Sequence, residues 1–310
     1  MKALGISGVD TLREYRRYYP AGEVTGHLLG FTNVDDVGQE GLELAFDQWL
    51  GGEPGIKRVM RDREGRTIED IERIKAPRPG QDLRTSIDLR VQYLAYRALK
   101  QAVQENSAHG GSVVVLDIQT GEVLAMVNQP AFNPHDREQY LPSRYRNPAT
   151  NDFFEPGSSI KPFVVAAGLK TGRFHSDTLI ETGPGTLRVG IKTVKDKHNL
   201  GTIDVRTVLE KSSNVGIVKI ALTLKPQEMW STLRDLGFGS VTGSGFPGES
   251  AGILTGYDHW PSIGQATMSY GYGLSVTPLQ LAQAYAVLGA GGMRRPVSLR
   301  RVDVPPEGER

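Results

Sequence analysis

Glu155-Pro-Gly-Ser-Ser-Ile-Lys-Pro-Phe163 is the stretch of sequence that decides the fold. Within it Ser158 and Lys161 are three positions apart, so on a helix their side chains lie on one face and within reach of each other. A serine hydroxyl is a weak nucleophile near neutral pH and needs a base beside it. Lysine is such a base only without its proton, and its unperturbed pKa is about 10.4. Burial and the positive end of a helix dipole both lower that pKa.

The residues around this pair predict a helix from Ser158 through Leu169, with Gly172 as its C-terminal cap. Pro162 fits because proline is tolerated in a first helical turn. At such a helix start the Ser158 backbone N–H can point at a developing oxyanion. The simpler alternative is a capping serine followed by a surface lysine, and that interpretation predicts no partner motif downstream.

A partner motif does follow about 50 residues later, in Lys211-Ser-Ser-Asn-Val-Gly216. Ser212 and Asn214 have the S-x-N spacing that accompanies S-x-x-K in serine acyl enzymes. Ser212 would relay a proton between Lys161 and a leaving amine, and the Asn214 amide would hold Lys161 and a peptide carbonyl. Capping of the next helix by Ser213 or Asn214 is the alternative, and both interpretations can hold together.

These two motifs resemble the first two boxes of class B penicillin-binding proteins, and most closely the division-specific (septal) D,D-transpeptidases. Three N-terminal stretches resemble the pedestal, or dimerisation, module of that family: Arg17-Tyr-Tyr-Pro-Ala-Gly-Glu23, 27–31 and 41–47. The segment Ser269–Pro278 resembles the one that borders the active-site cleft. The resemblance therefore implies that Tyr270 and Tyr272 lie near the substrate groove, whereas the residues alone predict core aromatics.

The resemblance implies an activity. Ser158 would attack the carbonyl of the penultimate D-Ala of a stem peptide and expel the terminal D-Ala, and an amine from a neighbouring stem peptide would resolve the acyl-enzyme. The implied partners are peptidoglycan stem peptides, β-lactams and proteins of the division machinery, at the periplasmic face of the inner membrane. The alternatives are a D,D-carboxypeptidase, a β-lactamase and a β-lactam-binding division scaffold without catalysis. The pedestal module argues against a β-lactamase.

The third box of the family, K-T-G or K-S-G on an edge strand, does not follow Pro278 before the chain ends at Arg310. Lys170-Thr-Gly172 lies at the end of the Ser158 helix, so it cannot form a strand across from Ser158. In the family that strand supplies an oxyanion donor, and losing one such donor typically costs about 10²–10³ in rate. We therefore expect a chain truncated at both ends, without a membrane anchor in front and without the third box behind.

The predicted fold class is α+β, a penicillin-binding or serine β-lactamase-like transpeptidase domain with an antiparallel sheet flanked by helices, its C-terminal strands missing. The prolines of Lys75-Ala-Pro-Arg-Pro-Gly80 indicate a linker. We expect part of the pedestal at 1–75, the linker at 76–82 and the incomplete transpeptidase domain at 83–310. Its first predicted elements are a strand at 83–87, a helix capped by Asp88 that runs to about Asn106, and a hairpin at 112–127. Later helices are predicted near 204–212, 214–223, 227–236 and 277–289.

Composition excludes several function classes. The net charge is +1, with 36 basic and 35 acidic residues, so no nucleic-acid partner is expected. No stretch approaches the roughly 18 apolar residues of a membrane span. There is no cysteine, and the 6 histidines have no ligand spacing, so neither a metal nor another cofactor is predicted. Gly243–Gly248 formally matches G-x-G-x-x-G but follows no strand, and Lys195–His198 is predicted to be a solvated charged loop.

Overall fold

The structure is a computed structural model that describes residues 17–136 and 142–309. The chain forms two compact units. The first contains the residues up to 84 together with the segment 130–146, and the second contains 85–129 and 147–310. The predicted linker, 76–82, belongs to the first unit, where Arg78 and Glu53 exchange two backbone hydrogen bonds of 2.8 and 2.9 Å. No sequence pattern indicated that 130–136 and 142–146 would belong to the first unit.

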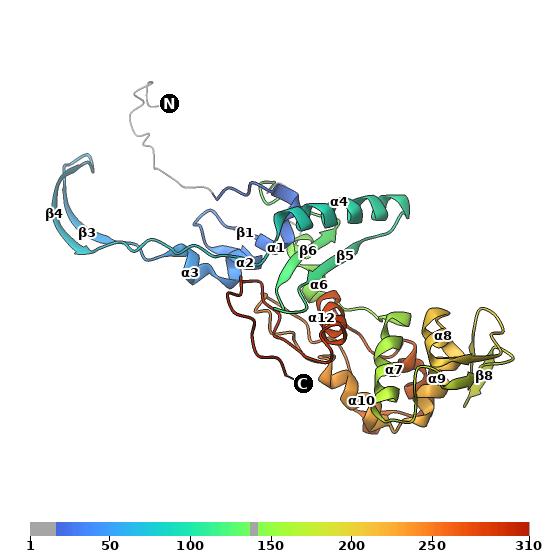
Figure 1. Ribbon diagram of the computed structural model, residues 1–310. Helices are drawn as coiled ribbons and strands as arrows, with labels where there is room; N and C mark the ends of the chain where they lie inside the picture. Colours follow the sequence, from blue (N-terminus) through green and yellow to red (C-terminus); the bar gives the residue numbers. More distant parts are fainter. Residues whose placement is uncertain (1–16, 137–141, 310) are drawn as a thin grey trace. The chain divides into compact units, whose positions relative to one another are not determined.

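The first unit is built from short elements around a small aromatic cluster. Its most extended part is the antiparallel ribbon β3–β4, in which nearly every residue is exposed (Figure 1). The elements are η2 (Gly22–Val24), α1 (Gly26–Leu29), β1 (Phe31–Thr32), β2 (Gly38–Glu40), α2 (Gly41–Ala45), α3 (Asp47–Gly51), β3 (Ile56–Arg61), β4 (Thr67–Lys75) and α5 (Pro142–Tyr145).

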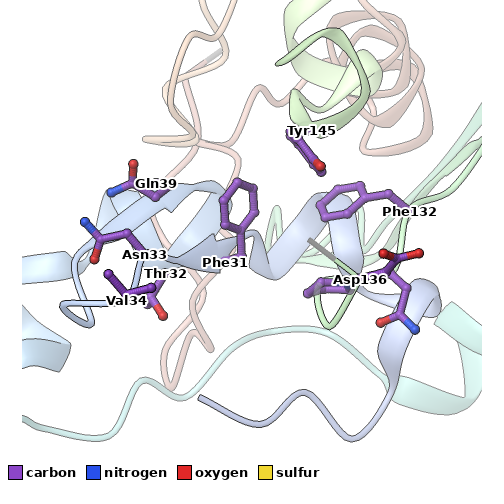
Figure 2. A pocket seen from close by; sticks show the side chains of 10 residues that line it. Phe31, Thr32, Asn33, Val34, Gln39, Phe132, Asp136 and Tyr145 are labelled. Carbon is purple, nitrogen blue, oxygen red and sulfur yellow. The ribbon is translucent and has the colours of Figure 1, made fainter. Parts of the chain in front are cut away.

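A pocket of about 210 Å³ opens beside the aromatic cluster of this unit. Figure 2 shows that Phe31, Phe132 and Tyr145 contribute their rings to its lining. The ring centroids of Phe31 and Phe132 both lie 4.9 Å from that of Tyr145, in edge-to-face contacts. Edge-to-face packing is the favoured arrangement of aromatic pairs, so the cluster forms the small core of this unit. None of the predicted site residues lines the pocket.

The second unit carries every predicted site residue. Its strands form separate antiparallel pairs, β5–β6, β7–β10 and β8–β9. The elements are α4 (Leu89–Glu105), β5 (Gly111–Leu116), β6 (Val123–Gln129), α6 (Pro148–Asn151), η3 (Gly157–Ile160), α7 (Lys161–Lys170), β7 (Leu179–Glu181), β8 (Thr186–Val189), β9 (Lys192–Lys195), β10 (Thr202–Asp204), α8 (Val205–Glu210), α9 (Asn214–Thr223), α10 (Pro226–Asp235), η4 (Tyr257–His259), α11 (Ser262–Ser269) and α12 (Pro278–Gly289).

Local sequence explains where several helices begin. The Asp88 side chain accepts hydrogen bonds from the N–H groups of Arg90 and Val91 and so caps α4, as predicted. Thr277 caps α12, and Gln280 completes a capping box.

The predicted strand at 83–87 is wrong, because Thr85 makes only an isolated bridge to Arg300. Only two strands, β5 and β6, pair beside α4 among the described residues.

The core of the second unit lies between its helices. In Figure 1, α4 lies along the β5–β6 hairpin, whereas α7, α8, α9 and α10 are grouped together further along this unit. Helix α7 contacts both α9 and α10, and α9 contacts α11. Phe163, Ile217, Met229 and Phe238 are fully buried in this cluster. Over the described ranges, the structure has no helix with the length and apolar character of a membrane span.

Candidate active site

The Ser158 segment enters its helix through a 3₁₀ turn. The predicted helix begins later than expected, since 157–160 is the 3₁₀ helix η3 and the α-helix starts at Lys161. Pro162 has no N–H to donate to the carbonyl of Ser158, and that carbonyl accepts instead from the N–H of Lys161. The Ser159 hydroxyl tightens the turn further by donating to the carbonyl of Pro156 at 2.6 Å. The Ser158 residue is exposed at this turn.

Lys161 is one of the largest fully buried side chains of the chain, with 2% of its surface exposed. Its Nζ lies 2.6 Å from the carbonyl oxygen of Ser212 and 3.0 Å from the Ser212 hydroxyl. The same Nζ lies 2.7 Å from Oδ1 of Asn214. The structure thus brings together three of the predicted site residues, which come from two separate motifs.

The turn between α8 and α9 presents Ser212 and Asn214 to the lysine. Ser212 has φ of 53°, in the left-handed region that non-glycine residues rarely adopt. Ser213 is the N-cap of α9, and its hydroxyl accepts from the N–H of Gly216 at 2.8 Å. In this motif Ser213 therefore caps α9 while Ser212 and Asn214 contact Lys161. Asn214 also donates from Nδ2 to the carbonyl of Lys195 at 3.1 Å, which fixes the orientation of its amide.

Burial lowers the pKa of Lys161 from 10.5 to about 8, and the negative charge of Asp196 acts in the opposite direction. Desolvation disfavours the charged ammonium, whereas a nearby carboxylate favours it. The balance leaves a substantial fraction of neutral amine close to physiological pH. This amine can act as a base, which an exposed lysine with an ordinary pKa cannot do efficiently.

The side chains of Ser158 and Lys161 share no hydrogen bond in the part of the chain that the structure describes. The two residues are adjacent across one tight turn, joined by the backbone bond from the Lys161 N–H to the Ser158 carbonyl. The side-chain pairing expected from helical spacing is replaced by the contacts of Lys161 with Ser212 and Asn214. Lys161 is therefore bound to the second motif, while Ser158 is an exposed residue.

The segment that contains Tyr270 and Tyr272 lies against the Ser158 turn. The N–H of Gly157 donates to the carbonyl of Gly271 at 3.1 Å, and the N–H of Gly273 donates to Oε1 of Glu155 at 2.9 Å. The rings of Tyr270 and Tyr272 are 5.7 Å apart. Tyr270 packs against the core, while Tyr272 is 52% exposed.

Sequence reasoning missed three residues of this region. Tyr285, from α12, donates its hydroxyl to the carbonyl of Ser159 at 2.9 Å, and Glu155 binds the Gly273 N–H as described above. Asp196 belongs to the loop predicted to be solvated, but its carboxylate binds the start of α9. No local pattern predicted these contacts, because each one joins segments that are distant in sequence.

No group of three or more His, Cys, Asp or Glu side chains with the geometry of a metal site occurs in residues 17–136 and 142–309. A cavity of about 610 Å³ lies beside β5 and is lined by residues that include Ser112, Phe153 and Tyr285. It does not include Ser158, Lys161 or the Ser212–Asn214 turn among its lining residues.

Two family models match the chain. The penicillin binding protein transpeptidase domain matches residues 111–310, and the penicillin-binding protein dimerisation domain matches residues 2–85. The chain belongs to the penicillin-binding protein transpeptidase family. The resemblance seen in the sequence, and the α+β fold class that it implied, are confirmed.

Curated relatives agree with this assignment. The chain is 44% identical over 310 residues to the peptidoglycan D,D-transpeptidase FtsI of Escherichia coli (strain K12), covering all of this chain and 52% of that protein. It is 43% identical over 312 residues to the probable peptidoglycan D,D-transpeptidase PenA of Neisseria meningitidis serogroup A, covering all of this chain and 53% of that protein. The chain thus spans about half the length of the curated relatives it matches.

A solved structure is also similar. The transpeptidase domain of penicillin-binding protein 3 from Burkholderia pseudomallei, determined in its apo form, has a TM-score of 0.67 and 42% sequence identity. The match covers 75% of this chain and 66% of that chain.

Proposed function

We propose that the protein is a peptidoglycan D,D-transpeptidase, with Ser158 as its acyl-forming nucleophile and Lys161, Ser212 and Asn214 as the groups that serve it. One observation carries this proposal: the amine of Lys161 is buried beside the Ser212–Asn214 turn, one turn after the exposed Ser158. The names of the FtsI and PenA relatives support the same reaction.

The partners of Lys161 determine how its amine acts. The carbonyl oxygen of Ser212 and Oδ1 of Asn214 can only accept hydrogen bonds, whereas the Ser212 hydroxyl can also donate. A neutral amine has two N–H bonds and one lone pair. It can keep both bonds to the carbonyl oxygens, and its lone pair is then free to face a hydroxyl. This arrangement holds Lys161 in place while leaving it able to take a proton.

The acylation step follows from this geometry. Nζ of Lys161 takes the proton of the Ser158 hydroxyl as Oγ bonds to the carbonyl carbon of the penultimate D-Ala. The oxyanion that forms faces the backbone N–H of Ser158. When the C–N bond breaks, the proton passes from Lys161 through the Ser212 hydroxyl to the nitrogen of the departing D-Ala. Asn214 has a second amide hydrogen, beyond the one bound to Lys195, for the peptide carbonyl of the substrate.

Deacylation completes cross-linking. The amine of a neighbouring stem peptide attacks the ester carbonyl, its proton moves to Lys161, and Ser158 regains a proton as the ester bond breaks. A β-lactam would acylate the same serine and stall there. We also propose that Tyr270 and Tyr272 border the substrate groove, because their segment is hydrogen-bonded to the Ser158 turn.

The setting of this reaction follows from its substrate. Peptidoglycan is assembled outside the cytoplasmic membrane, so we propose action at the periplasmic face of the inner membrane, in the septal wall and with division-machinery proteins as partners. The dimerisation-domain match at 2–85 supports a pedestal role for the N-terminal residues. We propose 1–75 as part of the pedestal, 76–82 as linker and 83–310 as transpeptidase domain, of which the segments 130–136 and 142–146 belong to the first compact unit.

Labelling with a fluorescent penicillin tests the proposal on the whole protein. We expect wild type and Ser159→Ala to be labelled covalently and Ser158→Ala to remain unlabelled, since only the first hydroxyl is the nucleophile. Incubation with a donor stem pentapeptide and an acceptor amine should then yield a cross-linked product and free D-Ala. Labelling that persists in Ser158→Ala, with circular dichroism confirming its fold, would show that another residue is the nucleophile.

A further inference from the structure

The carboxylate of Asp196 binds three donors at the first turn of α9. Oδ1 accepts from the backbone N–H of Asn214 at 2.5 Å and from that of Val215 at 3.0 Å. Oδ2 accepts from the hydroxyl of Ser213 at 2.7 Å. Asp196 lies in the loop between β9 and β10, so its three bonds tie this loop to the turn that carries Ser212.

The Asp196 carboxylate adds a second capping group to α9, beside the Ser213 hydroxyl. The Ser213 hydroxyl accepts from the N–H of Gly216 and donates to Asp196, and the Ser213 side chain is buried, with 1% exposed. Backbone N–H groups at a helix start have no partner within the helix. One carboxylate and one hydroxyl together therefore satisfy the N–H groups of Asn214, Val215 and Gly216.

The turn needs such support because Ser212 has a positive φ. An L-residue keeps this conformation only where the surrounding structure over-determines it. Asp196 holds the backbone of Asn214, and the neighbouring carbonyl of Lys195 holds the Asn214 side-chain amide. With Nδ2 bound there, Oδ1 of Asn214 is left facing Nζ of Lys161 at 2.7 Å.

We propose that Asp196 is a positioning residue of the acylation site, which fixes the Ser212–Asn214 turn against Lys161 and places a negative charge that acts on that amine. This inference rests on the proposed function of Ser158 and Lys161. Asp196 does not touch the reacting atoms. It acts through the residues that hold the base.

The charge of Asp196 has a separate consequence. It raises the pKa of Lys161 against the larger effect of burial. The other charged side chains on the adjoining segments are Lys195 and Lys197 beside Asp196, Lys211 before the turn, and Glu155 before Ser158. Of all these groups, Asp196 is the one whose charge shifts the pKa of Lys161. Removing that charge should lower the pKa of Lys161, so the neutral amine would be populated at lower pH.

Asp196→Asn removes the charge and keeps two of the three hydrogen bonds, since its amide nitrogen cannot accept from the Ser213 hydroxyl. Its amide oxygen can still accept from the N–H groups of Asn214 and Val215, so the fold should survive. In the whole protein we expect the second-order rate constant of acylation by benzylpenicillin to fall about tenfold, within the range that small misplacements of catalytic groups produce. The acid limb of its pH profile should move to lower pH. Asp196→Glu, which keeps the charge, should retain the acid limb near its wild-type position.

Asp204→Asn is the matched control, because Asp204 caps the preceding helix α8 by accepting from the N–H of Thr207 at 2.7 Å. We expect Asp204→Asn to lower the melting temperature about as much as Asp196→Asn does, while leaving the pH profile of acylation unchanged. If Asp196→Asn has the wild-type acid limb and behaves like Asp204→Asn, Asp196 is only a helix cap and the inference fails. If wild type itself is not acylated at Ser158, the proposed function fails instead.

Discussion

The Nζ atom of Lys161 lies 3.0 Å from the Oγ atom of Ser212, although 51 residues separate the two in the chain. Lys161 begins α7 and Ser213 caps α9, and these two helices pack against each other. Their packing brings two helix starts to one place. The positive ends of both dipoles add to burial in disfavouring an ammonium ion there. The same apolar contacts that form the core therefore prepare the base.

The pH dependence of acylation should report this base. Because the neutral amine of Lys161 takes the serine proton, the rate constant for benzylpenicillin should rise with pH and level off above an apparent pKa of about 8. Stopped-flow or quenched-flow measurement of the acylation rate constant, at pH values from about 6 to about 10 in steps of roughly half a unit, checks this. Thermal melts at each pH control for unfolding. A rate that does not change across this range would exclude Lys161 as the titrating base.

Lys161→Met should remove the base while keeping an apolar side chain of similar length in the buried site. We expect acylation to fall by about 10²–10⁴, the usual contribution of a general base. Lys170→Met is the matched control, since Lys170 ends the same helix with its side chain 65% exposed. Penicillin labelling followed over time measures both. Wild-type labelling rates in Lys161→Met would contradict the assigned role.

The same substitution has an effect on stability that depends on pH. The pKa of Lys161 is lower in the folded protein, about 8, than its ordinary value of 10.5. Between these values the unfolded state binds more protons, so folding stability rises with pH there. The free energy of unfolding of wild type, relative to Lys161→Met, should therefore increase as the pH is raised from 8 to 10.5. Urea melts at each pH measure the free energy of unfolding of both proteins. A difference between them that does not change with pH would mean that Lys161 has an ordinary pKa.

Gly271 should tolerate no side chain. Its φ is +94°, and a Cβ there would lie 2.0 Å from the carbonyl oxygen of Gly157. Gly271→Ala must therefore push the Tyr270–Tyr272 segment away from the Ser158 turn, and we expect both slower acylation and a lower melting temperature. Gly273→Ala is the control for backbone strain alone, because its φ is +85° but nothing lies within 4 Å. Equal acylation rates in the two variants would show that the close contact is unimportant.

Sequence patterns were sufficient for the parts of the site that lie within single motifs. The S-x-x-K and S-x-N spacings identified Lys161, Ser212 and Asn214, which the structure brings together. Helical periodicity and capping residues located α4, α9 and α12 to within a few residues. These elements were predictable because each is determined by neighbours in the sequence, through hydrophobic spacing and side-chain caps.

Contacts between distant segments were not predictable. The short strands β7 to β10 and the helix α11 have no strong periodic pattern. They are stabilised by packing on neighbouring elements: β7, β9 and α11 contact α9, β8 contacts α11, and β10 contacts α8. Asp196 was predicted to be solvated because it belongs to the charged stretch Lys195–His198, yet its carboxylate accepts a hydrogen bond from the first turn of α9. Pro162 has no N–H to donate to the Ser158 carbonyl, so the chain forms a 3₁₀ turn there instead of an α-helical turn. This turn changed the expected contact between Ser158 and Lys161.

The protonation of one amine tests the acylation site most directly. In the whole protein labelled with ¹³C,¹⁵N-lysine, the Nζ resonance of Lys161, assigned by its loss in Lys161→Met, can be followed as the pH is changed. We predict a titration with a pKa of about 8, while exposed lysines titrate near their ordinary value of about 10.4. A Lys161 resonance that titrates together with the exposed lysines would contradict a neutral amine as the base for Ser158.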